Sequence, residues 1–108
     1  MYGYQLTFYT QRGRTHGLLG VAEWIMKVAK DLGIKGGTLN KAETGFGRDG
    51  KYYSAHFFEL TEQPVEVTMA VTSEQADALF SKIEEAGLKV FFVKIPVEFG
   101  ITGGGAAA

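Results

Sequence analysis

The segment Thr44 to Gly50, with the sequence TGFGRDG, combines residue types that suit an anion. Gly45, Gly47 and Gly50 permit positive φ angles and let a ligand approach backbone N–H groups. Arg48 adds a forked guanidinium donor that suits phosphate or carboxylate. The spacing is neither the Walker nor the dinucleotide-binding fingerprint. The residues alone therefore leave two interpretations open: an anion site, or a hairpin connection whose glycines serve only the turn.

A second segment bounded by glycines, Gly13 to Gly17 with the sequence GRTHG, is similar to the phosphate loop of acylphosphatases. That family binds phosphate through the backbone N–H groups of a Gly-Arg-x-x-Gly loop, and Asn40 would lie near its water-positioning Asn on the second strand. Leu18 to Val21 offers no arginine after the second glycine, so the charge of a transition state would lack its strong partner. We therefore predict a polar loop before the first helix and no catalytic residue.

Metal binding and stacking are the other chemistries that the side chains suggest. The chain has no cysteine, and its two histidines, His16 and His56, are far apart and lack the carboxylate spacing of a known metal site. We interpret His56 as a strand residue and predict no metal ligand. Trp24 is predicted to pack in the fold, whereas Tyr52 and Tyr53 are interpreted as exposed loop residues that could stack on a base.

Composition limits what the chain can bind. The 108 residues are 45% hydrophobic, with 11 basic and 12 acidic side chains, which predicts one globular domain over residues 1–102 and a flexible tail at 103–108. Balanced charge argues against nucleic acid and anionic membranes, because both require clustered Lys and Arg. No apolar run is long enough to cross a bilayer, and the absence of cysteine fits a reducing compartment. We expect a cytoplasmic protein without membrane insertion.

The elements that must position these segments follow from hydrophobic periodicity. Alternation at Tyr4, Leu6 and Phe8 predicts a first strand. Apolar residues at helical spacing from Leu18 to Leu32, followed by Gly33, predict a first helix.

The second half of the chain continues this order. Further strand segments are predicted at Thr38–Thr44, Ser54–Leu60, Val65–Val71 and Lys89–Ile95. A second helix is predicted before the last of these, with Thr72 or Ser73 as its N-cap, a capping box with Gln75, and Gly87 at its end. The last strand is apolar on both faces, as a central or interface strand would be.

The resulting order predicts an α+β fold, the ferredoxin-like βαββαβ sandwich, in which two helices cover one face of an antiparallel sheet. The other face would expose apolar side chains unless another subunit covered it. We therefore expect an oligomer, closed as a homotrimer around the sheets.

The stretches GGTLNKAETGFGRDG and PVEVTMAVTSEQADALFSKI make the chain similar to PII signalling proteins over roughly residues 4–100. It looks most like the PII-like family known as domain of unknown function 190. PII proteins carry a Gly-Phe-Gly-Arg segment at the base of a mobile T-loop, after the second strand, where GFGR falls here. They are homotrimers that bind adenine nucleotides in clefts between subunits, and their T-loop docks on transporters, enzymes or regulators.

The resemblance implies ligand-binding residues at two places. They are Thr38, Gly45, Phe46, Gly47 and Arg48 at the second strand and the loop base, and Gly87 and Lys89 before the last strand. The chain also departs from the family pattern. The T-loop is shortened to about Arg48 to Tyr53, the B-loop has lost most of its glycine-rich length, and EFGITGGG lacks the paired arginines after the last strand. These departures argue against a triphosphate and leave a smaller adenine nucleotide or another anion.

The expected function is that of a non-enzymatic PII-like regulatory protein, a trimer that senses a small anionic metabolite through the segment 45–53. The resemblance implies an adenine nucleotide (AMP, ADP or ATP) as effector, and a membrane transporter or a regulatory protein as partner. Two alternatives stay open: a metal-handling trimer like the copper-tolerance proteins, which share this topology, and an acylphosphatase-like phosphohydrolase.

Overall fold

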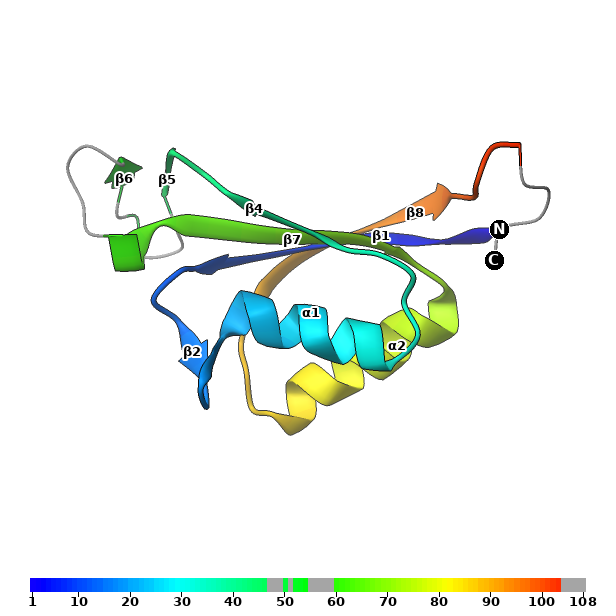
Figure 1. Cartoon of the computed structure of the whole chain (residues 1–108), viewed down its shortest axis with the longest axis horizontal. Helices are drawn as coiled ribbons and strands as arrows, with labels where there is room; N and C mark the ends of the chain where they lie inside the picture. The colour runs from blue at the N-terminus through cyan, green and yellow to red at the C-terminus, as the bar shows by residue number, and fades with distance from the viewer. Residues whose placement is uncertain (47–49, 51, 55–59, 104–108) are drawn as a thin grey trace.

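The computed structural model describes residues 1–46, 50, 52–54 and 60–103. Its centre is a four-stranded antiparallel sheet with the strand order β4-β7-β1-β8. The strands are β1 (Tyr2–Gln11), β4 (Thr38–Lys41), β7 (Pro64–Val71) and β8 (Phe91–Glu98), and the helices are α1 (Val21–Asp31) and α2 (Ser73–Glu85). Both helices lie on one face of the sheet (Figure 1). This is the predicted ferredoxin-like βαββαβ arrangement, so the fold class is confirmed.

The core lies between the sheet and the two helices. Alternate residues of the central strands point into it, and the register places Phe8 of β1 opposite Val67 of β7. Both are almost fully buried, together with Leu6, Ile25 and Leu79. Burying one side chain of this size contributes about 1.5–3 kcal/mol, so this layer supplies most of the stability.

The second helix begins with the predicted capping box. The Thr72 Oγ1 atom accepts a hydrogen bond from the Gln75 backbone N–H at 3.1 Å, and the Gln75 side chain accepts one from the Thr72 N–H at 3.0 Å. The helix is followed by Gly87, whose φ of +69° suits glycine. Both ends of this helix could therefore be predicted from local sequence.

The first helix begins three residues later than predicted. Leu18 is fully exposed, in the turn between the short strands β2 (Thr15–His16) and β3 (Leu19–Gly20). Gly17, with a φ of +64°, makes this turn. Because β2 and β3 pair with each other, the helix cannot start before Val21, and Leu18 does not join its apolar stripe.

The predicted second strand is broken into two pieces. After β4, the Ala42 N–H donates to the Pro64 carbonyl at 2.9 Å, and β5 (Thr44–Phe46) then pairs with β6 (Tyr52–Ser54) in a separate hairpin. Of the strand predicted at 54–60, residues 55–59 lie outside the described part of the chain. Leu60 begins a 3-10 turn, η1 (Leu60–Glu62), so the strand prediction is wrong there.

The last strand lies at the edge of the sheet, not in its centre. It starts at Phe91 and ends at Glu98, two residues later at its start and three residues later at its end than predicted. On the face that the helices leave uncovered, Phe91 and Ile95 are about half exposed. The central-strand interpretation is therefore wrong within one chain, and the interface interpretation stays a prediction.

Candidate functional site

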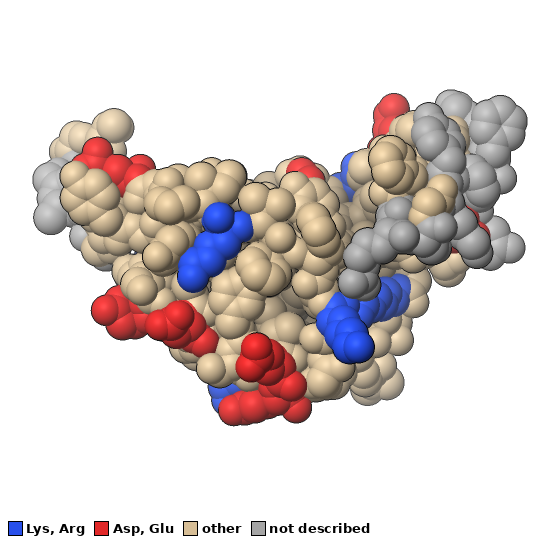
Figure 2. All heavy atoms as spheres, turned by 180° about the vertical axis from the view of Figure 1, so that it is seen from behind, with Lys and Arg blue, Asp and Glu red and all other residues tan. Residues whose placement is uncertain are grey.

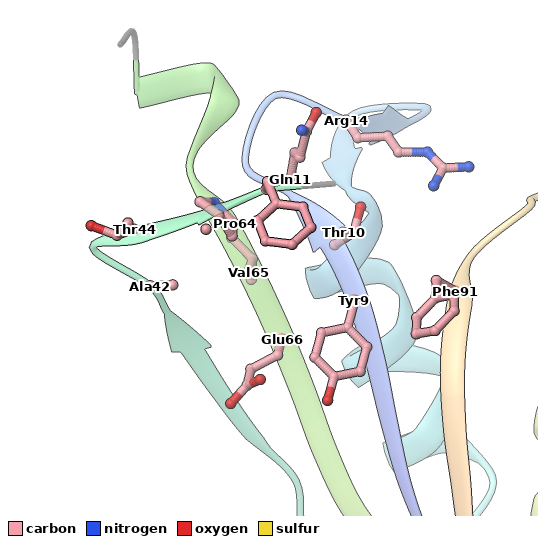
Figure 3. Close-up of a pocket in the computed structure, with 12 residues that line it drawn as sticks. Tyr9, Thr10, Gln11, Arg14, Ala42, Thr44, Pro64, Val65, Glu66 and Phe91 are labelled. Atoms are coloured by element: carbon pink, nitrogen blue, oxygen red, sulfur yellow. The ribbon is translucent and has the colours of Figure 1, made fainter. Parts of the chain in front are cut away.

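A cavity of about 1000 Å³ lies at the end of the sheet where β1 finishes, β7 begins and β5 branches away (Figure 3). Its walls come from β1, β5, β7 and the start of β8, and from Arg14 beyond the end of β1. A volume of this order accommodates a drug-sized ligand. The cavity is therefore the first place to look for a binding site.

The wall from β5 contains two of the residues predicted from the glycine segment, Gly45 and Phe46. A Cβ atom on Gly45 would lie 3.1 Å from the Cγ atom of Pro64, which is tighter than most real contacts. A larger residue would thus push β5 away from β7. Of the two described glycines in the TGFGRDG segment, Gly50 has a positive φ of +77° and Gly45 does not, so Gly45 serves close packing and not a left-handed turn.

The floor of the cavity is a cross-strand row on the uncovered face of the sheet. Tyr9 of β1 lies opposite Glu66 of β7 on one side and opposite Phe91 of β8 on the other. The rings of Tyr9 and Phe91 are 5.7 Å apart and inclined at 58°. Asn40 of β4 lies opposite Glu66, outside the residues that line the cavity. Two half-exposed rings offer a surface for a planar group, and Glu66 offers hydrogen-bond acceptors to its edge.

Arg14 lines the end of the cavity that is turned away from Thr44 (Figure 3). Its backbone is held on both sides, because its N–H donates to the Gln11 carbonyl at 3.1 Å and its carbonyl accepts from the Val21 N–H at 2.9 Å. Its guanidinium Nη2 donates to the Lys89 carbonyl. This contact brings the segment before β8, with the predicted site residue Lys89, next to the cavity.

The other predicted site residues lie farther from the cavity or outside the described chain. Thr38 lies opposite Thr68 on the uncovered face, one cross-strand row beyond Asn40. Gly87 lies after α2, and its N–H donates to the Glu84 carbonyl at 2.9 Å. Residues 47 and 48, the predicted Gly47 and Arg48, are not among the described residues. The structure thus brings together Gly45, Phe46 and, through its backbone, Lys89.

The stacking residues differ from those predicted. Tyr53 is 3% exposed, so its interpretation as an exposed loop residue is wrong, and the side chain of Tyr52 lies outside the described part. The rings available to a ligand are instead those of Tyr9 and Phe91. Strand alternation alone would place Tyr9 on the face opposite buried Phe8, but only the register shows that its ring is adjacent to that of Phe91.

Backbone N–H groups of the GRTHG segment, the segment compared with the acylphosphatase phosphate loop, are engaged within the protein. The Gly13 N–H donates to the Thr61 carbonyl at 2.8 Å and the Arg14 N–H to Gln11, while Thr15 and His16 pair with β3. These backbone donors face protein acceptors. The His16 ring instead packs edge-on against Trp24, with centroids 5.0 Å apart.

The surface adds little that would suit other ligands. Among the described residues, no three His, Asp or Glu side chains are grouped as metal ligands would be, and His56 is not one of those residues. On the face seen in Figure 2, the described Lys and Arg side chains lie singly or in small groups. None of the helices in the described part of the chain is long and apolar enough to span a membrane.

Several solved structures that share this fold are PII-like proteins. CPII, a nitrogen regulatory PII-like protein from Thiomonas intermedia K12 solved with ADP, AMP and bicarbonate, is 24% identical over 90% of this chain and 89% of its own, with a TM-score of 0.58. A putative PII-like signalling protein from Thermus thermophilus is 15% identical, covers 90% of both chains and has a TM-score of 0.61. A DUF3240 family protein from Shewanella baltica OS155 is 15% identical over 94% and 98% of the chains, with a TM-score of 0.54.

The family model that matches the chain is more specific. DUF190, described as "Uncharacterized ACR", matches residues 3–98. The chain therefore belongs to the DUF190 family, as the resemblance predicted, and it shares its fold with PII-like proteins. No curated protein sequence matches it significantly.

Proposed function

We propose that this protein is a PII-like regulatory protein that binds an adenine nucleotide in the cavity at the base of the segment 45–53. The observation that carries the proposal is the position of the cavity. Gly45 and Phe46 form one of its walls, and the Tyr9–Phe91 ring pair forms another. CPII, which shares the fold, was solved with ADP, AMP and bicarbonate in one structure and with ADP and bicarbonate in another.

The chemistry of the cavity suits such a ligand. The purine stacks on Tyr9 and Phe91, which is worth about 1–3 kcal/mol for one base on an aromatic side chain. Glu66 accepts a hydrogen bond from the exocyclic amine, because a carboxylate is a strong acceptor for N–H donors. The phosphate charge suits arginine, and the family resemblance implies Arg48 for this role.

The proposal includes a homotrimer whose subunits complete one another's sites. Tyr9, Glu66 and Phe91 lie on the sheet face that the helices leave uncovered, so a second copy packed there closes the cavity and brings Thr38 and Lys89 to the cleft. Nucleotide binding then favours one arrangement of the segment 45–53. A membrane transporter or a regulatory protein in the cytoplasm recognises that arrangement. In this proposal the PII-like protein catalyses no reaction.

Calorimetry of the full chain against AMP, ADP, ATP, cyclic AMP and bicarbonate tests the proposal. AMP or ADP is expected to bind, and more weakly at high salt because a partly exposed guanidinium–phosphate contact is screened. Arg48→Ala should weaken binding by about 1.5–3 kcal/mol, more than tenfold, without changing thermal stability of the ligand-free protein. The control is Lys27→Ala, which removes an exposed charge from α1. The proposal is wrong if no nucleotide binds.

A further inference from the structure

The turn after β1 contains two arginines in different surroundings. Arg12 is exposed and does not line the cavity, whereas Arg14 is partly buried and does. The Arg14 side chain is held in place by its hydrogen bond to the Lys89 carbonyl. An arginine carries five N–H donors, and this bond uses one of them. A cation fixed at the edge of a cavity with donors to spare is preorganised for an anion.

A buried hydroxyl lies near the end of β1, on the same face of the strand as Phe8 and opposite to Tyr9. Thr10 is 9% exposed and lines the cavity, and its Oγ1 atom has no hydrogen-bond partner within the part of the chain that the structure describes. A buried polar atom without a partner costs free energy. A ligand oxygen that reached Thr10 would remove this cost, so the hydroxyl is a second, independent sign of a polar ligand at this end.

We infer that Arg14 and Thr10 form the anion-binding end of the cavity and hold the phosphate of the nucleotide or a free pyrophosphate. In Figure 3, Arg14 lies on the far side of the cavity from Thr44 and next to the β8 side that carries Phe91. Arg14 therefore lies on the Phe91 side of the cavity, where it can reach an anion bound beside the Tyr9–Phe91 pair. Because Arg14 also bonds to the segment before β8, anion binding there would stiffen the contact between the turn after β1 and that segment. The identity of the base in this inference rests on the proposed function. The binding of an anion at Arg14 does not depend on it.

The test is calorimetry of the full chain with ADP, adenosine and pyrophosphate as separate probes. Arg14→Gln removes the charge but keeps an amide N–H for the Lys89 carbonyl, and Arg12→Gln is the matched control. We expect Arg14→Gln to weaken ADP and pyrophosphate binding by about tenfold or more and to leave adenosine binding within about twofold. Arg12→Gln should leave all three within about twofold. If Arg14→Gln does not fold, Arg14→Lys replaces it, with a smaller loss because Lys cannot form the fork.

Thr10→Val tests the second residue. It keeps the shape and removes the hydroxyl, so we expect weaker ADP binding with no fall in the Tm of the ligand-free protein. A lower Tm would show that the hydroxyl already has a partner, and would overturn its part in the site.

The outcomes separate this inference from the proposed function. If wild type binds ADP and Arg14→Gln binds it equally well, the inference fails alone. It also fails if adenosine binding falls as much as ADP binding, because Arg14 then acts only on the fold. If wild type binds pyrophosphate through Arg14 but binds neither ADP nor adenosine, the anion site stands and the nucleotide proposal fails. If pyrophosphate and ADP both fail to bind wild type, both are overturned.

Discussion

Phe8 and Tyr9 are consecutive aromatic residues of β1, yet they lie in opposite environments. Phe8 is 1% exposed beneath the helices, with its ring 5.7 Å from that of Phe80 in α2. Tyr9 is 41% exposed on the other face, against Phe91 at the edge of the sheet. The two faces therefore have separate tasks. The covered face holds the domain together, and the uncovered face offers aromatic and polar groups to a ligand or another subunit.

The largest expected effect comes from removing one ring from each face. Phe8→Ala should lower the free energy of unfolding by about 3–5 kcal/mol, since it leaves a cavity in the core. Tyr9→Ala should cost only about 0.5–1.5 kcal/mol, the range for a tilted ring contact. Urea unfolding at one fixed protein concentration measures both. If the two losses are equal, the difference between the faces does not hold in solution.

The next effect concerns assembly on the uncovered face. Ile95→Glu should disrupt the predicted homotrimer, because an aliphatic side chain buried in an interface contributes about 1.5–3 kcal/mol and a carboxylate there would be desolvated. Light scattering should give a mass near three times 11.8 kDa for wild type and a smaller mass for the variant. Ile101→Glu, which changes an exposed aliphatic residue after β8, is the control and should assemble normally. A wild-type mass of 11.8 kDa would contradict the trimer.

The smallest effect tests how the covering layer is anchored. Thr72→Ala removes the side-chain cap of α2 and should lower the free energy of unfolding by about 1 kcal/mol. Ser73→Ala, at the next position, should change it by less than about 0.5 kcal/mol, as is usual for an exposed surface residue. Thermal unfolding of both variants measures the difference. Equal values would mean that helix packing, and not the capping box, fixes the start of α2.

The fold could be predicted because its determinants are local. Phe8 and Val67 follow a period of two, Ile25 follows the helical period, and the cap at Thr72 depends on residues three positions apart. The ends of helices and strands are harder to predict from sequence. Leu18 fits the helical spacing, but backbone pairing between β2 and β3 removes it from the helix, and no local pattern reveals that pairing.

The residues of the candidate site also fall into those that the sequence predicts and those that it does not. Gly45 and Phe46 could be found from composition and from the family resemblance, because they lie in one short segment. The rest of the cavity could not be found, because its other walls come from residues far apart in the chain. Tyr9, Glu66 and Phe91 become neighbours only through the register of three strands.

The amino-acid sequence by itself determined which side chains of β1, β7 and α2 face the core, where α2 begins, and which family the chain resembles, since each depends on residue type and short spacing. Only the tertiary structure decided that β8 is an edge strand, that Tyr53 is buried, and that Arg14 and Thr10 share a cavity with Phe91. The physical reason is that burial and adjacency between distant segments depend on strand register and on backbone hydrogen bonds formed after the chain has folded.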